Sequence, residues 1–270
     1  MRSARRRLTW LALVAAAATA GCSRSEPLTP QAAAAKGDAL LRQMSKTLAG
    51  SQALAVTADE MREQVLANGQ KRQNTFTRAI VLRRPNAVTF VDKGSEHDGT
   101  GWYDGAHITI VSHRAKAWAR GPMPATLDEA LDFVSNEYAV QMPAADLLYS
   151  SPYDALVTED TKGGWVDVQQ IGGKPCDRLS YAQAVVDWEI WINQDERKLP
   201  CQIQITYKGT PGKPISRVTL RDWNLAPAIT ATTFTPEVPA NYQRLRILRH
   251  ATVDDTSVTA RPAPAPAKGK

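Results

Sequence analysis

The chain has 270 residues, of which 43% are hydrophobic and 22% charged, a composition typical of a globular protein with one sizeable core or two small ones. It excludes disorder, collagen and coiled coil as the main state. The net charge of +6 falls by four, to +2, when residues 1–21 are left out, because they carry four arginines and no acid. The charge therefore predicts no nucleic-acid partner.

The N-terminus has three regions in a fixed order: a basic run from Arg2 to Arg7, an apolar stretch from Leu8 to Ala18, and two small residues directly before Cys22. This order predicts a secretory signal over residues 1–21. The apolar stretch has about half of the ~20 residues needed to cross a bilayer, so a permanent transmembrane helix is the weaker interpretation. The small residues before Cys22 resemble the lipobox of bacterial lipoproteins.

That resemblance implies that Cys22 becomes the mature N-terminus and carries the lipid anchor, with plain secretion and an uncleaved anchor as alternatives. Two or more acyl chains hold a protein stably on a membrane, whereas one chain does so only marginally. Ser23 follows the cysteine, and by the enterobacterial sorting rule a residue other than aspartate there implies transfer to the outer membrane, facing the periplasm. Residues 22–29 are expected to be the anchor linker.

The next part of the chain changes from a helical to a strand-like pattern. Pro30 begins a segment that ends at Gly50 and predicts one amphipathic helix. The apolar residues at helical spacing in it are Leu40, Leu41, Met44 and Leu48. From Gln52 to Arg120, short β-prone runs alternate with turn signals, which predicts antiparallel hairpins. The turn signals are Asn68-Gly69, Arg84-Pro85, Lys93-Gly94 and Asp104-Gly105.

Two helices are then expected between groups of strands. Thr126 and Glu129 have the spacing of a capping box, which predicts a helix that continues to Tyr138. A short helix is expected at Ala144 to Tyr149. Asp146 lies in its first turn, where an acid complements the helix dipole, and an orientation toward a ligand is the alternative.

Strand-like alternation resumes at Trp165 and is clearest late in the chain. Trp188, Ile190 and Ile192 share one face of a predicted strand, and residues 201–207 repeat the pattern. Such alternation is typical of a sheet covered mainly on one side. A further strand is expected to end at Asp222-Trp223 and a last one to contain Phe234. Residues 249–270 are predicted to be a disordered tail rich in Pro, Ala and Lys.

One domain is therefore expected over residues 30–248, in the order helix, strands, two helices, strands. An antiparallel sheet with one apolar face covers that face most economically by curling around the helices. The predicted fold is α+β: a curved antiparallel sheet, or open half-barrel, covered by an N-terminal helix and a central helix pair.

Several short strings then point to a known family by their sequence and order. They are Gly101-Trp102-Tyr103-Asp104-Gly105, Pro143-Ala144-Ala145-Asp146-Leu147-Leu148, Asp187-Trp188-Glu189-Ile190-Trp191-Ile192 and Leu199-Pro200. The chain resembles, over residues 35–245, a bacterial family of predicted periplasmic proteins of unassigned function. That family looks like a branch of the half-barrel fold of the lipoprotein carrier LolA and its receptor LolB, which implies a lipid-binding cavity under helices. A shared fold does not by itself carry a shared function.

The sequence lacks the common catalytic motifs. A nucleophile elbow, a zincin helix, a P-loop and a Rossmann fingerprint are absent from the sequence, so we expect no catalytic residue, no metal and no cofactor. Glu96-His97-Asp98 is the one place where a histidine adjoins carboxylates, and it is interpreted as the tip of a solvated hairpin rather than a metal site or a catalytic cluster. Trp102 is interpreted as filling the core, with a place at the mouth of a cavity as the alternative.

The favoured hypothesis is a non-enzymatic, lipid-anchored binding protein that holds an acyl chain or another apolar ligand between sheet and helices. The candidate cavity-lining residues are Trp102, Leu147, Leu148, Trp188, Ile190, Ile192, Ile203 and Ile205. The alternative is an envelope interaction protein whose core is filled by its own side chains. The partners expected are the membrane, through the N-terminal lipid, and a lipid or acyl ligand; the sequence identifies no protein partner.

Cys176 and Cys201 are the two thiols that remain after acylation, and an oxidising periplasm favours their pairing. The expected register opposes this. With Leu179 facing Ile190, Cys176 lies on the outer face, whereas a two-residue turn after the next strand places Cys201 on the inner face. The cysteines are then about 10 Å apart, beyond the ~7 Å Cα limit, so no bond between them is expected.

Overall fold

The computed structural model describes residues 28–138 and 140–247. The predicted signal peptide, Cys22 and the expected tail from residue 249 lie outside the described residues. The helices are α1 (Pro30–Ala49), α2 (Leu127–Tyr138), the 3-10 helix η1 (Ala145–Leu148) and α3 (Pro152–Leu156). The strands are β1 (Ala53–Val65), β2 (Lys71–Arg83), β3 (Ala87–Gly94), β4 (Asp98–Tyr103), β5 (His107–Ser112), β6 (Ala117–Pro122), β7 (Lys162–Ile171), β8 (Lys174–Ala182), β9 (Val186–Asn193), β10 (Pro200–Tyr207), β11 (Ile215–Asn224) and β12 (Gln243–Leu245).

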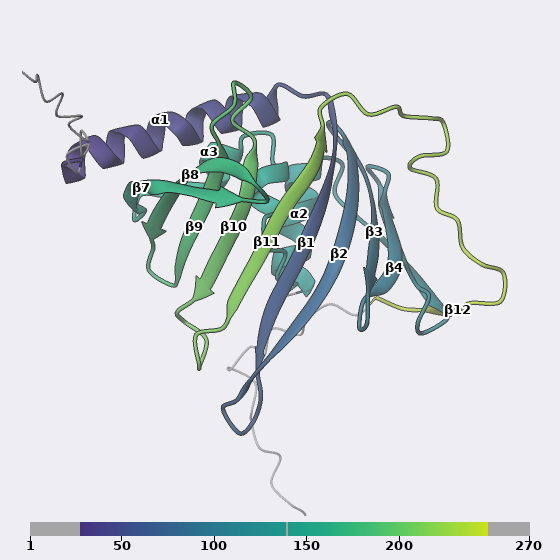
Figure 1. Cartoon of the computed structure of the whole chain (residues 1–270). Helices are drawn as coiled ribbons and strands as arrows, with labels where there is room; N and C mark the ends of the chain where they lie inside the picture. The colour runs from purple at the N-terminus through teal and green to yellow at the C-terminus, as the bar shows by residue number, and fades with distance from the viewer. Residues whose placement is uncertain (1–27, 139, 248–270) are drawn as a thin grey trace, which may run out of the picture.

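The strands of the described part form one sheet in the order β12-β6-β5-β4-β3-β2-β1-β11-β10-β9-β8-β7 (Figure 1). Strands β1 to β6 form one meander and β7 to β11 another, and the antiparallel pair β1 and β11 joins them. The neighbouring pairs are antiparallel except β12 with β6, which is parallel. Strands β7 and β12 end the sheet on opposite sides, so the sheet is open, and the predicted fold class is confirmed.

The first helix agrees with the sequence prediction. The Thr29 hydroxyl accepts a hydrogen bond from the backbone N–H of Ala32 at 3.2 Å, which caps the N-terminus. The residues at helical spacing form its buried face: Leu40, Leu41, Met44 and Leu48. Helix α1 packs against β7 and α3 and lies across one end of the sheet (Figure 1). No helix in the described ranges is both long and apolar enough to cross a membrane.

The connection between β6 and β7 carries the other helices. The predicted capping box begins α2: the Thr126 N–H donates to the Glu129 carboxylate and the Glu129 N–H to the Thr126 hydroxyl, each at 3.3 Å. The expected short helix is the 3-10 helix η1, and α3 follows it without having been predicted. Leu127, Ala130 and Leu131 are buried, so α2 turns its apolar side toward the sheet. We call the sheet face that α2 covers the inner face.

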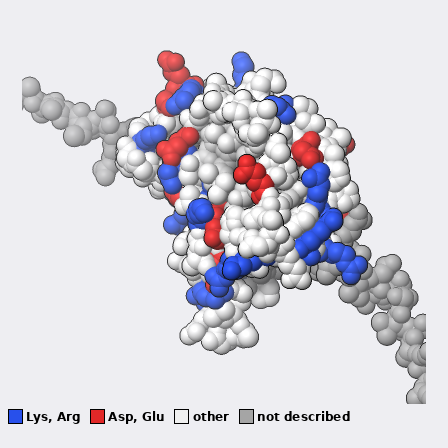
Figure 2. Space-filling view, turned by 90° about the vertical axis from the view of Figure 1, so that its right-hand side faces the viewer, with Lys and Arg blue, Asp and Glu red and all other residues white. Residues whose placement is uncertain are grey.

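The side of the molecule toward β3 to β6 and the C-terminal segment carries charges of both signs. Figure 2 shows lysines and arginines along the right-hand edge of this side and also on its left and lower parts, with acidic side chains scattered among them. Ion pairs link parts of this region: Lys93 on β3 pairs with Asp98 on β4 at 3.3 Å, and Arg120 on β6 pairs with Asp104 after β4 at 3.3 Å.

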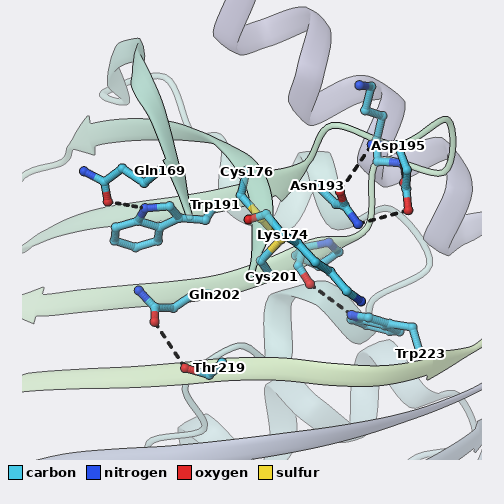
Figure 3. The surroundings of a disulfide bond; sticks show 12 residues. Gln169, Lys174, Cys176, Trp191, Asn193, Asp195, Cys201, Gln202, Thr219 and Trp223 are labelled. Atoms are coloured by element: carbon cyan, nitrogen blue, oxygen red, sulfur yellow. Dashed lines mark hydrogen bonds between the residues drawn. A yellow bond between two sulfur atoms is a disulfide. The ribbon is translucent and has the colours of Figure 1, made fainter. Parts of the chain in front are cut away.

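The two cysteines form a disulfide, so the prediction of two separate thiols was wrong (Figure 3). The register of β8 with β9 is as predicted, with Leu179 opposite Ile190 and Cys176 opposite Asn193. The predicted register was wrong for the next pair of strands, β9 and β10. Strand β9 ends at Asn193 and β10 begins at Pro200, so the connection is longer than the two residues expected.

A bulge then changes the face that Cys201 occupies. Pro200 lies opposite Ile192 and Gln202 opposite Trp191, which leaves Cys201 as an extra residue between two paired positions. An extra residue reverses the alternation of faces. Cys201 therefore packs with Trp191 and Cys176 in a small cluster on the outer face. Cys176 lies opposite the last residue of β9, and at that end the Cα atoms of the two cysteines come to 6.9 Å.

The predicted strand at Phe234 was also wrong. Strand β11 ends at Asn224, and the chain runs without a strand until β12 begins at Gln243. In this segment a threonine hydroxyl accepts a hydrogen bond from the backbone: the Thr230 N–H donates to the Thr233 hydroxyl at 2.9 Å. Such side-chain bonds favour turns over a strand ladder. Phe234 is nevertheless buried, and the Arg83 guanidinium lies over its ring.

Candidate functional site

A large cavity lies between α2 and the inner face of the early strands. Its volume is about 530 Å³. We call it the large cavity, and its described lining is Val56, Ala58, Glu60, Arg78, Ile80, Val88, Phe90, Asp92, Tyr103, Ile108, Ile110, Met123, Leu127, Ala130, Leu131, Val134, Tyr138, Val140, Met142, Pro143, Ala144, Ala145, Leu147, Leu148, Val218, Leu220, Trp223 and Ile247. Most of these side chains are apolar, and the volume falls within the ~300–1,000 Å³ typical of small-molecule sites.

Alternation along the strands produces this lining. In β1, Val56, Ala58 and Glu60 are buried in turn, because every second side chain points to the same face. Small residues leave the space open: Ala58 on β1 and Ala130 on α2 contribute only a methyl group to the wall. Gly101 has a related role, since an added Cβ would lie 2.2 Å from the ring of Phe90. The ring can rest on β4 only because this residue is glycine.

A group of charged side chains lies at one end of the large cavity. Arg78 donates two hydrogen bonds to Asp92, at 2.6 and 2.7 Å, and lies 3.4 Å from Glu60. Arg62 binds the other oxygen of Glu60 at 2.6 Å. Glu60 and Asp92 are buried, and each has an arginine partner, which offsets the cost of burying a charge. We call Arg62, Glu60, Arg78 and Asp92 the charged cluster.

Rings surround the arginines of the charged cluster. The Arg78 guanidinium lies 4.9 Å from the ring centre of Phe90 and 5.3 Å from that of Phe76. Arg62 lies 5.2 Å from the Phe76 ring. These cation–π contacts hold the two side chains against the sheet. The large cavity thus has apolar walls and one end at which fixed charges neutralise one another.

A second, small cavity adjoins the first under the late strands. Its volume is about 390 Å³, and its described lining is Leu131, Ser135, Val140, Gln141, Met142, Pro143, Ala145, Asp146, Tyr149, Ala155, Leu156, Thr158, Gln183, Val186, Trp188, Ile203, Ile205 and Tyr207. The two cavities share Leu131, Val140, Met142, Pro143 and Ala145. The segment between α2 and η1 is therefore a common wall, and in it Ala144 has a left-handed backbone, with φ of 67°.

The predicted cavity-lining residues are divided among four places. Trp188, Ile203 and Ile205 line the small cavity, whereas Leu147 and Leu148 line the large one. Ile190 and Ile192 are completely buried in the main core. Trp102 is among the described lining of neither cavity. It is buried, and its neighbour Tyr103 faces the large cavity, so strand alternation directs the indole to the outer face.

Sequence reasoning missed the charged cluster, although β1 holds a signal for it. Leu54, Val56 and Ala58 alternate as an apolar face, and the same face continues with Glu60 and Arg62. A charge in register with buried apolar residues indicates a buried polar site. The partners Arg78 and Asp92 lie directly opposite each other on β2 and β3, which only the register reveals.

The segment Glu96-His97-Asp98 lies at the β3–β4 turn, where β4 begins with Asp98. The His97 ring packs 4.2 Å from the ring of Phe76, and Arg72 pairs with Glu96 at 3.4 Å. In the described ranges, no group of three or more His, Cys, Asp or Glu side chains is arranged to hold a metal ion.

Comparison with known protein families assigns this chain to one of them. Residues 37–248 match the family model described as "Predicted periplasmic protein (DUF2092)". No curated protein matches the chain.

Among solved structures, the chain is similar to an uncharacterized conserved protein from Thermus thermophilus, with 9% identity over 77% of this chain and 98% of that one and a TM-score of 0.45. It is also similar to the lipoprotein LppX from Mycobacterium tuberculosis, with 14% identity over 72% and 97% of the chains and a TM-score of 0.45. A LolA superfamily protein from Nitrosomonas europaea aligns with 10% identity over 74% and 98% and a TM-score of 0.38.

Proposed function

We propose a function from the premise that this chain belongs to the DUF2092 family of predicted periplasmic proteins, the relationship that the short strings indicated. In this proposal the protein is a non-enzymatic binding protein, anchored by lipid on Cys22 to the periplasmic face of the outer membrane. Its domain, residues 30–248, holds an acyl chain or another apolar ligand in the large cavity.

One observation carries the proposal: a cavity of about 530 Å³ whose walls are apolar on both the strand side and the α2 side. Burying a hydrocarbon chain there releases about 0.8 kcal/mol for each CH₂ removed from water. The charged cluster makes one end of the large cavity polar. An acyl chain therefore fits with its hydrocarbon along the walls and its polar group away from them.

The anchor and the cavity support each other in this account. A protein that stays at the membrane surface meets acyl chains there, and exposed apolar side chains near the entrance help to receive them. Ile110 and Val140 line the large cavity and are 40% and 45% exposed. Apolar groups left in water beside a cavity are typical of a ligand entrance.

The proposal is tested by mass spectrometry of lipid extracted from the purified full chain. Solvent extraction leaves covalently bound acyl groups on the protein, so released lipid reports non-covalently bound molecules, and the variant with a filled large cavity shows the share that this cavity holds. We expect about one lipid-derived acyl species per cavity in the wild type. No lipid above the level extracted from a variant with a filled cavity would contradict the proposal.

A further inference from the structure

The small cavity contains a carboxyl group without a cationic partner. Asp146 lines this cavity and accepts a hydrogen bond from its own backbone N–H, but within the described residues no lysine, arginine or histidine forms an ion pair with it. Two other polar side chains of the lining are engaged by hydrogen bonds. The Tyr149 hydroxyl donates to Asp132 at 2.7 Å, and the Gln183 amide donates to the Leu156 carbonyl at 3.1 Å.

An unpaired carboxylate is costly in such surroundings. Burial raises the pKa of Asp146 from its ordinary value of 3.8 to about 6, because an ionised group loses its hydration there. At pH 7 the group is still mostly ionised. The small cavity therefore presents one half-buried negative charge that no cation of the described protein neutralises, and a bound cation would reduce the cost.

The remaining walls suit a cation that carries an apolar body. Three aromatic side chains line the small cavity with Asp146, namely Tyr149, Trp188 and Tyr207. Ring faces attract ammonium groups by about 0.5–2 kcal/mol. Leu156, Val186, Ile203 and Ile205 supply aliphatic surface for a hydrocarbon chain.

We propose that the small cavity binds the ammonium group of a cationic amphiphile, with the Asp146 carboxylate as its counter-ion. A metal ion is a poor alternative, because hard cations require several oxygen ligands and Asp146 is the one carboxylate among the described lining. An anionic headgroup would be repelled. This inference concerns the small cavity and does not rest on the function proposed for the large one.

Binding should depend on pH through the Asp146 carboxyl. Few other titratable or charged groups face this carboxyl. Tyr149 and Tyr207 face it from η1's end and from β10, and burial raises the pKa of both. Arg62 and Glu60 act on Tyr207 from β1, but they pair with each other. Asp132 is held by Tyr149. As the pH falls through about 6, the Asp146 carboxyl takes up a proton and the attraction for ammonium is lost.

The test is calorimetric titration of the purified full chain with n-decylammonium chloride and, separately, with sodium decanoate, both as monomers at pH 8. We expect decylammonium to bind at least tenfold more tightly than decanoate at the small cavity. Asp146→Asn should abolish this preference, because it removes the charge and keeps the shape. Asp154→Asn removes an exposed carboxylate of α3 and should leave the preference unchanged.

Wild-type protein gives a second readout that needs no variant. Its affinity for decylammonium should fall about tenfold between pH 7.5 and pH 5, as expected for a carboxyl that titrates near 6. A parallel titration with lysophosphatidylethanolamine distinguishes a lipid headgroup from a free amine as the ligand. If this lipid binds and Asp146→Asn weakens its binding, the site accepts the headgroup. If only decylammonium binds, the site accepts free amines.

The inference is overturned if the protein shows no preference for the ammonium probe once the large cavity is filled by Ala58→Phe, or if the preference survives when Asp146→Asn is added. A substitution that fills the large cavity, Ala58→Phe, separates the two proposals. It should remove decanoate binding and leave the response to decylammonium at Asp146 intact.

Discussion

Cys176 on β8 and Cys201 on β10 are joined by a disulfide across the end of β9, with their Cα atoms 6.9 Å apart. The bond closes a loop of 25 residues that contains β9 and its turn. It links the late strands on the face opposite the cavities, so it stabilises the sheet without occupying ligand space.

Removing this bond should destabilise the fold. Cys176→Ser with Cys201→Ser is expected to lower the free energy of unfolding by about 3 kcal/mol, the entropy that a loop of this length regains in the unfolded chain. Denaturant unfolding measures the change. The wild type in reducing agent should lose the same amount, and the double variant should not respond to reductant. A double variant as stable as the oxidised wild type would contradict a structural role.

The charged cluster should be sensitive to the loss of one member. Arg78→Met leaves Glu60 and Asp92 buried without their shared cation, so we expect a loss of about 3–5 kcal/mol in unfolding free energy. Arg72→Met is the matched control. Arg72 is half exposed and pairs with Glu96 at the surface, where an ion pair contributes about 0–1 kcal/mol. Equal small losses in the two variants would show that the cluster is not held in place.

Stability should also depend on Asp146. The fold raises its pKa to about 6, so the protonated form is favoured in the native state and the benefit is present below pH 3.8 and lost as pH rises through 6. Asp146→Asn should match the wild type at pH 3.5 and exceed its unfolding free energy by about 2–3 kcal/mol at pH 8. Ligand-free protein must be used. Identical pH profiles for the two proteins would contradict a desolvated Asp146 carboxyl without a cationic partner.

The anchor prediction concerns Cys22, outside the described residues. Cys22→Ser should move the protein from the outer-membrane fraction to another fraction, because acylation needs the thiol. Fractionation with immunodetection measures this, and mass spectrometry of the mature N-terminus provides the control. An unmodified Cys22 inside a mature chain cut elsewhere would contradict lipid anchoring.

Patterns along the chain predicted the elements that depend on local spacing. The buried face of α1, the capping box of α2 and the β8–β9 register with Leu179 opposite Ile190 all agree with the structure. Each of these follows from a regular period or from residues a few positions apart. Periodicity therefore predicted the fold class and most of its helices and strands.

Features that break a period could not be predicted in this way. The bulge at Cys201 adds one residue to an alternating strand, and no residue type marks it. Alternation also shows which face a side chain occupies but not how deeply the space above it is filled. Ile190 is in the packed core, whereas Ile203, directly opposite it, also lines a cavity. The difference depends on what α2 and η1 bring over the sheet.

The most direct test of the central claim, that the large cavity receives an acyl chain, is titration of the full chain with a fluorescent fatty acid. Wild-type protein should bind it saturably, and Ala58→Phe should abolish binding while leaving the unfolding temperature nearly unchanged, because the ring enters empty space. Ala79→Phe is the matched control: Ala79 is exposed on the outer face of the adjacent strand, and binding should persist. If the wild type does not saturate, and Ala58→Phe costs the ~1–3 kcal/mol of an overpacked core, the cavity is not a ligand site and the account is contradicted.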